Sequence, residues 1–146
     1  MKLSKQLLNN FIDITSKSAI ACYPFIGKDE KILADKAATD VMRNQLNKLS
    51  INGKVVIGEG ELDEAPMLYI GEKLGSGNGP EIDIAVDPVE GTNFVAKNLP
   101  GAMSVLAISE KGNLFNAPET YMDKIVTGSH IPKGSLDLDF TVEKNI

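Results

Sequence analysis

The sequence predicts an α/β fold, in which helices pack against a sheet, and three observations lead to it. Residues 3–21 and 30–49 carry apolar side chains at three- and four-residue spacing, which is typical of amphipathic helices. Residues 54–57 and 82–86 form short β-branched runs, which predict strands. Each of these strands leads directly into acidic residues, so we expect polar chemistry where the strands end.

The remaining predicted elements are shorter. Residues 65–70, with a proline in the first turn, predict a short helix. Residues 103–109 predict a buried strand, followed by a turn at 110–113 and a returning strand at 114–115. Residues 141–144 combine a polar cap with an acidic first turn and predict the beginning of a helix. Since the sequence stops there, we expect the chain to be truncated.

Length and composition narrow the class of protein. A chain of 146 residues with 42% hydrophobic and 24% charged residues is typical of one soluble globular domain. The net charge of -5 has the wrong sign for binding nucleic acid. Polar residues interrupt the N-terminal apolar pattern, which argues against a signal peptide and against insertion in a membrane. Cys22 and His130 are too few for a Cys/His zinc site, and a single cysteine favours the reducing cytoplasm.

The acidic residues that follow the two central strands suggest a metal site. Glu59 follows the first strand, and Asp87 follows the second. If the strands are parallel neighbours, both carboxylates lie at the C-terminal edge of the sheet, where α/β proteins bind ligands. Like charges gathered there repel one another unless a cation neutralises them. Oxygen ligands without His or Cys select hard ions such as Mg²⁺ or Mn²⁺.

Residues 87–92 carry further chemical information. Pro88 is expected to keep the backbone extended, with Asp87 and Glu90 in one tight turn, and two metals about 3.5–4 Å apart could share these carboxylates. Gly91 permits close approach of a ligand to the backbone. If a helix begins near Gly91, its first amides would face a phosphate, and the Thr92 hydroxyl could orient an attacking water. This combination is suited to phosphoryl transfer.

Some acidic residues have simpler explanations. Asp63 and Glu64 are interpreted as the cap and dipole partners of a short helix. Glu61 is equally compatible with a ligand and with a structural role. Asp83 is explained equally well by a solvated position, and composition alone predicts that Asp35 is a surface residue.

The segment Asp-Pro-Val-Glu-Gly-Thr at residues 87–92 resembles the signature of the lithium-sensitive, metal-dependent sugar and inositol phosphatases. Together with residues 56–69, 116–118 and 121–124, it resembles the bacterial class II fructose-1,6-bisphosphatase family. That family's chains are about twice as long as this one. The resemblance therefore implies that residues 1–146 form the N-terminal, metal-bearing half of a larger α-β-α-β-α layered sugar-phosphatase fold, whose C-terminal half is absent here.

The resemblance also implies roles for individual residues. The family's metal carboxylates match Asp35, Glu59, Asp87 and Glu90, and the metal would be Mn²⁺ or Mg²⁺. For Asp35 this replaces the surface interpretation. Thr92 matches the threonine that helps to activate the water, and with Asp35 it forms the catalytic pair. Substrate contacts are implied for Glu90, Gly91, Thr92 and Tyr121.

The function implied is hydrolysis of the 1-phosphate of fructose 1,6-bisphosphate to fructose 6-phosphate in gluconeogenesis, by a cytoplasmic homo-oligomer. One alternative is a truncated, non-catalytic chain that binds metal or a partner, because catalytic groups act as a unit. Another alternative is an inositol monophosphatase-like sugar phosphatase.

Overall fold

The computed structural model describes residues 4–59, 67–115 and 123–145 of the chain. The chain divides into two compact units, Met1–Asn116 and Ala117–Ile146.

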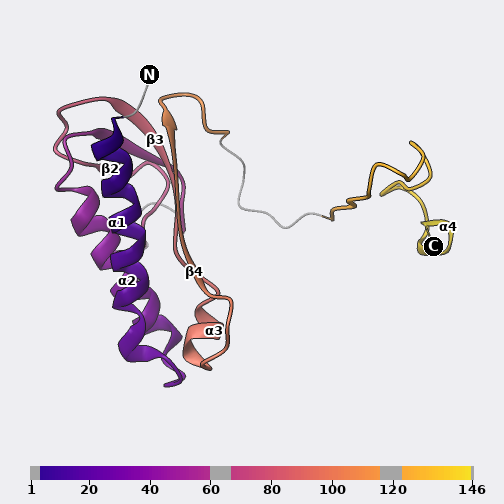
Figure 1. The fold of residues 1–146 in the computed structure, drawn as a ribbon, viewed down its shortest axis with the longest axis horizontal. Coiled ribbons are helices and arrows are strands. Elements are labelled where there is room, and N and C mark those ends of the chain that lie inside the picture. Colours follow the sequence, from indigo (N-terminus) through magenta and orange to yellow (C-terminus); the bar gives the residue numbers. More distant parts are fainter. Residues whose placement is uncertain (1–3, 60–66, 116–122, 146) are drawn as a thin grey trace. The chain divides into compact units, whose positions relative to one another are not determined.

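The first unit is a four-stranded sheet with two long helices on one face (Figure 1). The sheet order is β2-β1-β3-β4, in which β1 and β3 are parallel and the two outer strands are antiparallel to their neighbours. The mixed α/β class predicted from the sequence is therefore confirmed. The elements in chain order are α1 (Lys5–Ala21), the 3-10 turn η1 (Tyr23–Phe25), α2 (Lys31–Leu46), β1 (Asn52–Ile57), β2 (Lys73–Leu74), β3 (Glu81–Glu90), α3 (Thr92–Ala96) and β4 (Met103–Glu110).

The core lies between the two helices and the sheet. Side chains spaced by three and four residues along each helix meet alternate side chains of the strands, because these are the periods that place residues on one face. The buried cluster consists of Phe11, Ile14, Met42, Leu46, Ile51, Val55, Leu68, Leu74, Ile82, Ile84 and Val86. This burial fixes the position of α2 over β3, and thereby the position of Asp35 on α2 relative to β3.

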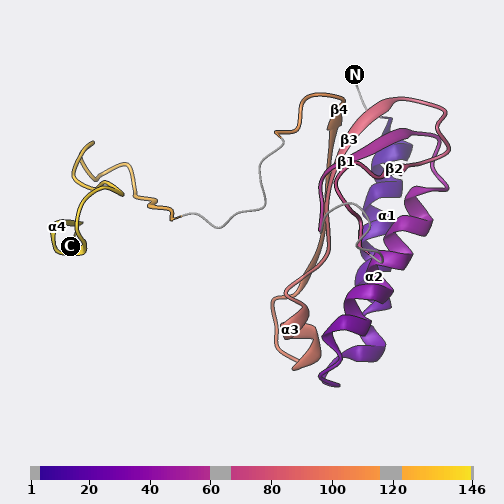
Figure 2. The same cartoon turned by 180° about the vertical axis from the view of Figure 1, so that it is seen from behind.

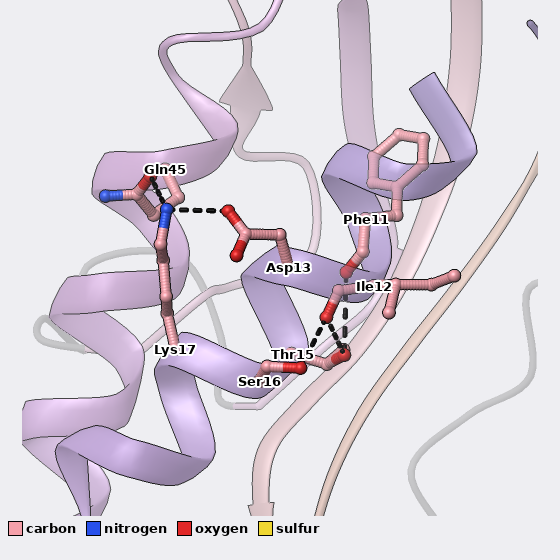
Figure 3. A network of polar contacts seen from close by, with 7 residues as sticks. All are labelled: Phe11, Ile12, Asp13, Thr15, Ser16, Lys17 and Gln45. Carbon is pink, nitrogen blue, oxygen red and sulfur yellow. Dashed lines mark hydrogen bonds and ion pairs between the residues drawn. The ribbon is translucent and has the colours of Figure 1, made fainter. Parts of the chain in front are cut away.

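The exposed sides of α1 and α2 are joined by a small polar network (Figure 3). The Lys17 ammonium pairs with Asp13 on its own helix at 2.6 Å and donates to Gln45 Oε1 of α2 at 3.4 Å. The Thr15 and Ser16 hydroxyls donate to the carbonyl oxygen of Ile12 at 3.0 and 2.9 Å. Exposed contacts of this kind contribute little to stability, so the apolar core holds the helices together.

Most of the predicted elements are confirmed, with ends shifted by a few residues. The two long helices and the strands at 54–57, 82–86 and 103–109 are all present. The prediction that the strand at 103–109 is buried is wrong, because β4 lies at the edge of the sheet and its residues are half-buried or exposed. The returning strand predicted at 114–115 is wrong, since these residues form no strand. The helix predicted at 65–70 is also wrong for 67–70, while its first residues lie outside the described part of the chain. Strand β2 was not predicted, because a two-residue strand has no detectable alternation.

The second unit contains the short helix α4 (Val142–Asn145), which confirms the helix start predicted at residues 141–144. The Asn145 side chain accepts from the amide of Asp137 at 3.0 Å and donates to the Asp137 carbonyl oxygen at 2.9 Å. The Lys144 ammonium lies 3.4 Å from the centre of the Phe140 ring. In the parts of the chain that the structure describes, no helix combines the length and the apolar character needed to cross a bilayer.

Replacement of Ile84 by alanine tests the core. Ile84 lies on the central strand β3 and has no exposed surface, so Ile84→Ala should lower the free energy of unfolding by about 2–5 kcal/mol. Ile32→Ala, at a side chain that is 74% exposed, should change it by less than about 0.5 kcal/mol. Urea denaturation followed by circular dichroism measures both values. Equal losses in the two variants would contradict the core described here.

Candidate active site

The parallel pairing of β1 and β3 brings two predicted acids to one edge of the sheet. Ile57 is the register partner of Ala85, and Glu59 and Asp87 each follow this pair by two residues on the two neighbouring strands. Parallel neighbours lie about 4.8 Å apart. The pairing on which the predicted convergence depends is therefore confirmed, and both residues are half-buried there.

Helix α2 contributes Asp35 to the same region. The small side chains of Ala34 and Ala38 pack against Val89 of β3 in a buried cluster, so the helix approaches the strand closely. Asp35 follows Ala34 and is only partly exposed, and its Oδ1 atom is buried without a hydrogen-bond partner among the described residues. The prediction from composition that Asp35 is a surface residue is wrong, because tertiary packing buries one of its oxygens.

The carboxylate of Asp87 is affected by its burial and by the nearby charges of Glu90 and Asp35. Burial raises the pKa of Asp87 to about 6, and its hydrogen bond with Glu90 and the charges of Glu90 and Asp35 act in the same direction. The backbone amide of Val89 opposes them and lowers this pKa. Burial also raises the pKa of Asp35. Like Asp35, Asp87 has a buried Oδ1 atom that no described residue contacts by a hydrogen bond.

The segment Asp87 to Thr92 differs in one respect from the prediction. The tight turn expected around Asp87 and Glu90 is absent, since both residues belong to β3, and the pairing with β4 becomes irregular between them. Pro88, which has no amide hydrogen, explains the irregularity because it cannot donate to the ladder. Glu90 nevertheless stays close enough to Asp87 to raise the pKa of that carboxyl group.

A helix begins directly after Glu90, as predicted. Gly91 adopts a left-handed conformation with φ of 86° and precedes the first residue of α3, Thr92. The short helix α3 lies at one end of the sheet, beyond the strands (Figure 2). A side chain at Gly91 would also meet the ring of Phe94, so glycine is required here for two reasons. The helix has five residues, too few for a sizeable macrodipole, so any contact with a phosphate would depend on individual amides.

Asp83 and Cys22 have structural roles outside the carboxylate edge. Asp83 is not solvated: it is 4% exposed, and its Oδ2 atom accepts from the amide of Gly112 at 2.6 Å, which fixes the turn after β4. Cys22 is a structural residue, since it is buried, and burial raises its pKa to about 11. The remaining predicted residues, Glu61, Asp63, Glu64 and Tyr121, lie outside the described residues.

Sequence reasoning missed polar residues that follow Asp35 on α2. Thr39 is buried, and its hydroxyl has no hydrogen-bond partner among the described residues. Arg43, one turn further, forms a part-buried ion pair with Glu72. The signal was present in the sequence, because Asp35, Thr39 and Arg43 follow one another at four-residue steps and therefore share one side of the helix.

The donor set fits a hard divalent cation. Carboxylate oxygens are the ligands such ions prefer, and the buried oxygens of Asp35 and Asp87 receive no hydrogen bond from any residue that the structure describes. Within residues 4–59, 67–115 and 123–145, however, no three His, Cys, Asp or Glu side chains converge closely enough to surround one ion. Asp35 and Glu90 are therefore close enough to affect the pKa of Asp87, but the described acids do not surround one ion.

Fold and site together define a mixed α/β protein with a carboxylate site at the C-terminal edge of a parallel strand pair. The solved structure of an extragenic suppressor from Pyrococcus furiosus has the same fold, with a TM-score of 0.50 over 73% of this chain and 41% of that chain, at 23% sequence identity. Residues 5–146 match the family described as bacterial fructose-1,6-bisphosphatase, glpX-encoded. The chain belongs to this family, as the sequence resemblance indicated.

Named relatives support the same assignment. The chain is 46% identical over 144 residues to fructose-1,6-bisphosphatase 1 class 2 of Escherichia coli (strain K12). It is equally similar to the D-fructose 1,6-bisphosphatase class 2/sedoheptulose 1,7-bisphosphatase of Prochlorococcus marinus (strain MIT 9515). Each alignment covers 99% of this chain and 43% of the relative, so the chain spans less than half the length of these relatives.

The raised pKa of Asp87 predicts how stability depends on pH without metal. Between about pH 4 and pH 6 the folded chain keeps a proton on Asp87 that the unfolded chain has lost, so stability falls as the pH rises. We expect a loss of about 1–2 kcal/mol, since solvent screens a half-buried group. Asp87→Asn should remove much of this loss, and Asp139→Asn, at an exposed carboxylate, should not. Urea denaturation at a series of pH values measures the free energy of unfolding. If this free energy depends on pH in the same way for Asp87→Asn and for the unaltered chain, the raised pKa of Asp87 is contradicted.

Proposed function

We propose that this chain is the metal-binding part of a phosphatase that hydrolyses the 1-phosphate of fructose 1,6-bisphosphate to fructose 6-phosphate. One structural observation carries the proposal: Asp35 and Asp87, from α2 and β3, each have a buried carboxylate oxygen without a hydrogen-bond partner among the described residues, and the charge of Asp35 helps to raise the pKa of Asp87. Burying like charges together is costly unless a cation compensates them. Membership of the bacterial fructose-1,6-bisphosphatase family supports the substrate.

The proposed metal ligands are Asp35, Glu59, Asp87 and Glu90. They come from α2, the end of β1 and the last part of β3, so the fold collects them from distant positions in the sequence. We propose Mn²⁺ or Mg²⁺, because both ions prefer carboxylate oxygens. A bound divalent ion would supply charge neutralisation for the transferred phosphoryl group and lower the pKa of a water.

The segment after β3 is proposed to bind the phosphate and to orient the water. Gly91 has no side chain that would hinder a phosphate oxygen approaching the backbone, and Glu90 and Thr92 flank it in the sequence. The Thr92 hydroxyl is proposed to accept a hydrogen bond from the attacking water and thereby align it with the phosphorus atom. Tyr121 is proposed as a sugar contact on the basis of the resemblance alone.

A second substrate has support from the relatives' names. The Prochlorococcus relatives are named for both fructose 1,6-bisphosphate and sedoheptulose 1,7-bisphosphate, and they are as similar to this chain as the Escherichia coli relative is. We therefore propose sedoheptulose 1,7-bisphosphate as the second candidate. On the basis of the resemblance alone, we also propose that the protein acts in gluconeogenesis in the cytoplasm, as a homo-oligomer.

Phosphate release tests the proposal directly. The chain would be assayed alone and as a chimaera in which it replaces the matching part of the Escherichia coli relative, since it covers 43% of that protein. We expect Mn²⁺- or Mg²⁺-dependent release from fructose 1,6-bisphosphate by the chimaera. A chimaera that folds but is silent, or that prefers inositol phosphate, would overturn the proposal. If the chimaera is active and the isolated chain is not, catalysis needs residues beyond these 146.

Asp87→Asn in the chimaera should reduce metal-dependent kcat by about 100-fold or more, because it removes one charged ligand from a site that acts as a unit. The fold should survive, since removing a negative charge from a group of repelling acids does not destabilise the metal-free state. Glu81→Gln, at an exposed carboxylate on the same strand, should keep full activity. Steady-state kinetics and circular dichroism measure both effects; unchanged kcat in Asp87→Asn would refute its role.

Thr92 gives a more selective prediction. Thr92→Ala should lower kcat by about 100-fold with little change in KM, because the hydroxyl is proposed to act on the water and not on the sugar. Thr92→Ser keeps the hydroxyl and should recover most of the rate. The comparison is made in the chimaera at saturating Mn²⁺. If alanine and serine have the same effect, the hydroxyl has no part in the reaction.

A further inference from the structure

The part-buried ion pair between Arg43 and Glu72 has no assigned role in the proposed function. Arg43 Nε lies 2.7 Å from Glu72 Oε1, and Arg43 Nη2 lies 3.1 Å from Glu72 Oε2, so the guanidinium holds the carboxylate with two bonds. The side chains are 23% and 11% exposed. Bidentate pairs at low exposure are stronger and more specific in geometry than surface pairs.

Arg43 also contacts the backbone beyond Glu72. Its Nη2 atom donates to the carbonyl oxygen of Met67 at 2.5 Å. A single side chain of α2 therefore holds both ends of segment 67–72, the first described residues after the acidic stretch that begins with Glu59. A lysine could not make these three contacts, since it offers a point charge in place of a planar fork.

Segment 67–72 in turn fixes the end of β1. The amide of Glu59 donates to the Leu68 carbonyl oxygen at 3.1 Å, and the amide of Val55 donates to the Glu72 carbonyl oxygen at 2.9 Å. The amide of Gly71 donates to the Val55 carbonyl oxygen at 2.8 Å. Gly58 has no room for a side chain, because a Cβ atom would collide with the Leu68 carbonyl oxygen. The backbone at Glu59 is thus held by residues that Arg43 anchors.

The same helix carries Asp35. Asp35 and Arg43 are eight residues apart on α2, about 12 Å along its axis. One end of the helix brings a carboxylate to β3, and the other end holds the segment that supports Glu59. The spacing between two acids on different elements therefore depends on one rigid helix.

We infer that Arg43 and Glu72 are positioning residues that hold Glu59 against the Leu68 backbone and thereby set its place at the carboxylate edge relative to Asp35. The inference deepens the proposed function and rests on it for the metal role of Glu59. Neither residue is a catalytic residue, because both act through the backbone of 67–72. The ion pair therefore positions Glu59 in addition to stabilising the fold.

Amide hydrogen exchange on the 146-residue chain tests the positioning without any metal. In Arg43→Lys and Glu72→Gln, the amides of Glu59 and Gly71 should exchange at least about 10-fold faster, while the Gly77 amide, bonded to Ile51 O outside the segment, keeps its rate. Lys17→Ala is the matched control, because it removes the exposed contact with Gln45, a residue of α2 that lies two positions from Arg43 (Figure 3). Unchanged exchange at Glu59, or an equal rise at all amides, would overturn the inference.

Mn²⁺ titration followed by electron paramagnetic resonance gives the second readout. If Arg43 positions a ligand, Arg43→Lys should weaken Mn²⁺ binding about 10-fold or more at a temperature where the variant is fully folded. A purely structural ion pair would lower the melting temperature and leave the Mn²⁺ affinity unchanged, which would also overturn the inference. If neither the unaltered chain nor the chimaera binds Mn²⁺, the metal role in the proposed function fails, and the exchange rates still decide the positioning.

Discussion

The site depends first on the parallel pairing of β1 and β3. Parallel neighbours need a long connection, and here residues between the two strands include β2 and the segment that returns over the end of β1. Because both strands point the same way, their acidic ends meet at one edge of the sheet. An antiparallel arrangement would have placed Glu59 and Asp87 at opposite edges, and no amount of side-chain rearrangement could then have joined them.

Close packing of α2 on the sheet is the second requirement. Ala34 and Ala38 are small enough to let the helix approach Val89, and this approach brings Asp35 into the field of Asp87. The acids are then partly removed from water, which raises the pKa of Asp35 and Asp87. A region of this kind favours binding of a cation, because a positive charge relieves both the repulsion and the cost of burial.

The arrangement also shows how one helix can serve two purposes. The buried face of α2 contributes Met42 and Leu46 to the core, and its polar side carries Asp35, Thr39 and Arg43. The apolar face gives the helix its stability and rigidity. That rigidity keeps the polar residues at constant spacing, which a loop could not do.

Hydrophobic periodicity and β-branched runs determined the main helices, the central strands and the α/β class, because these signals depend on local spacing. The motif at residues 87–92 and the acids after each strand similarly indicated Glu59, Asp87, Glu90 and Thr92 from the sequence. Tertiary structure alone decided that Asp83 fixes a turn, that Asp87 and Glu90 share a strand, and that Arg43 reaches Glu72. These outcomes depend on burial and on partners that are distant in the sequence, and local patterns carry no information about either.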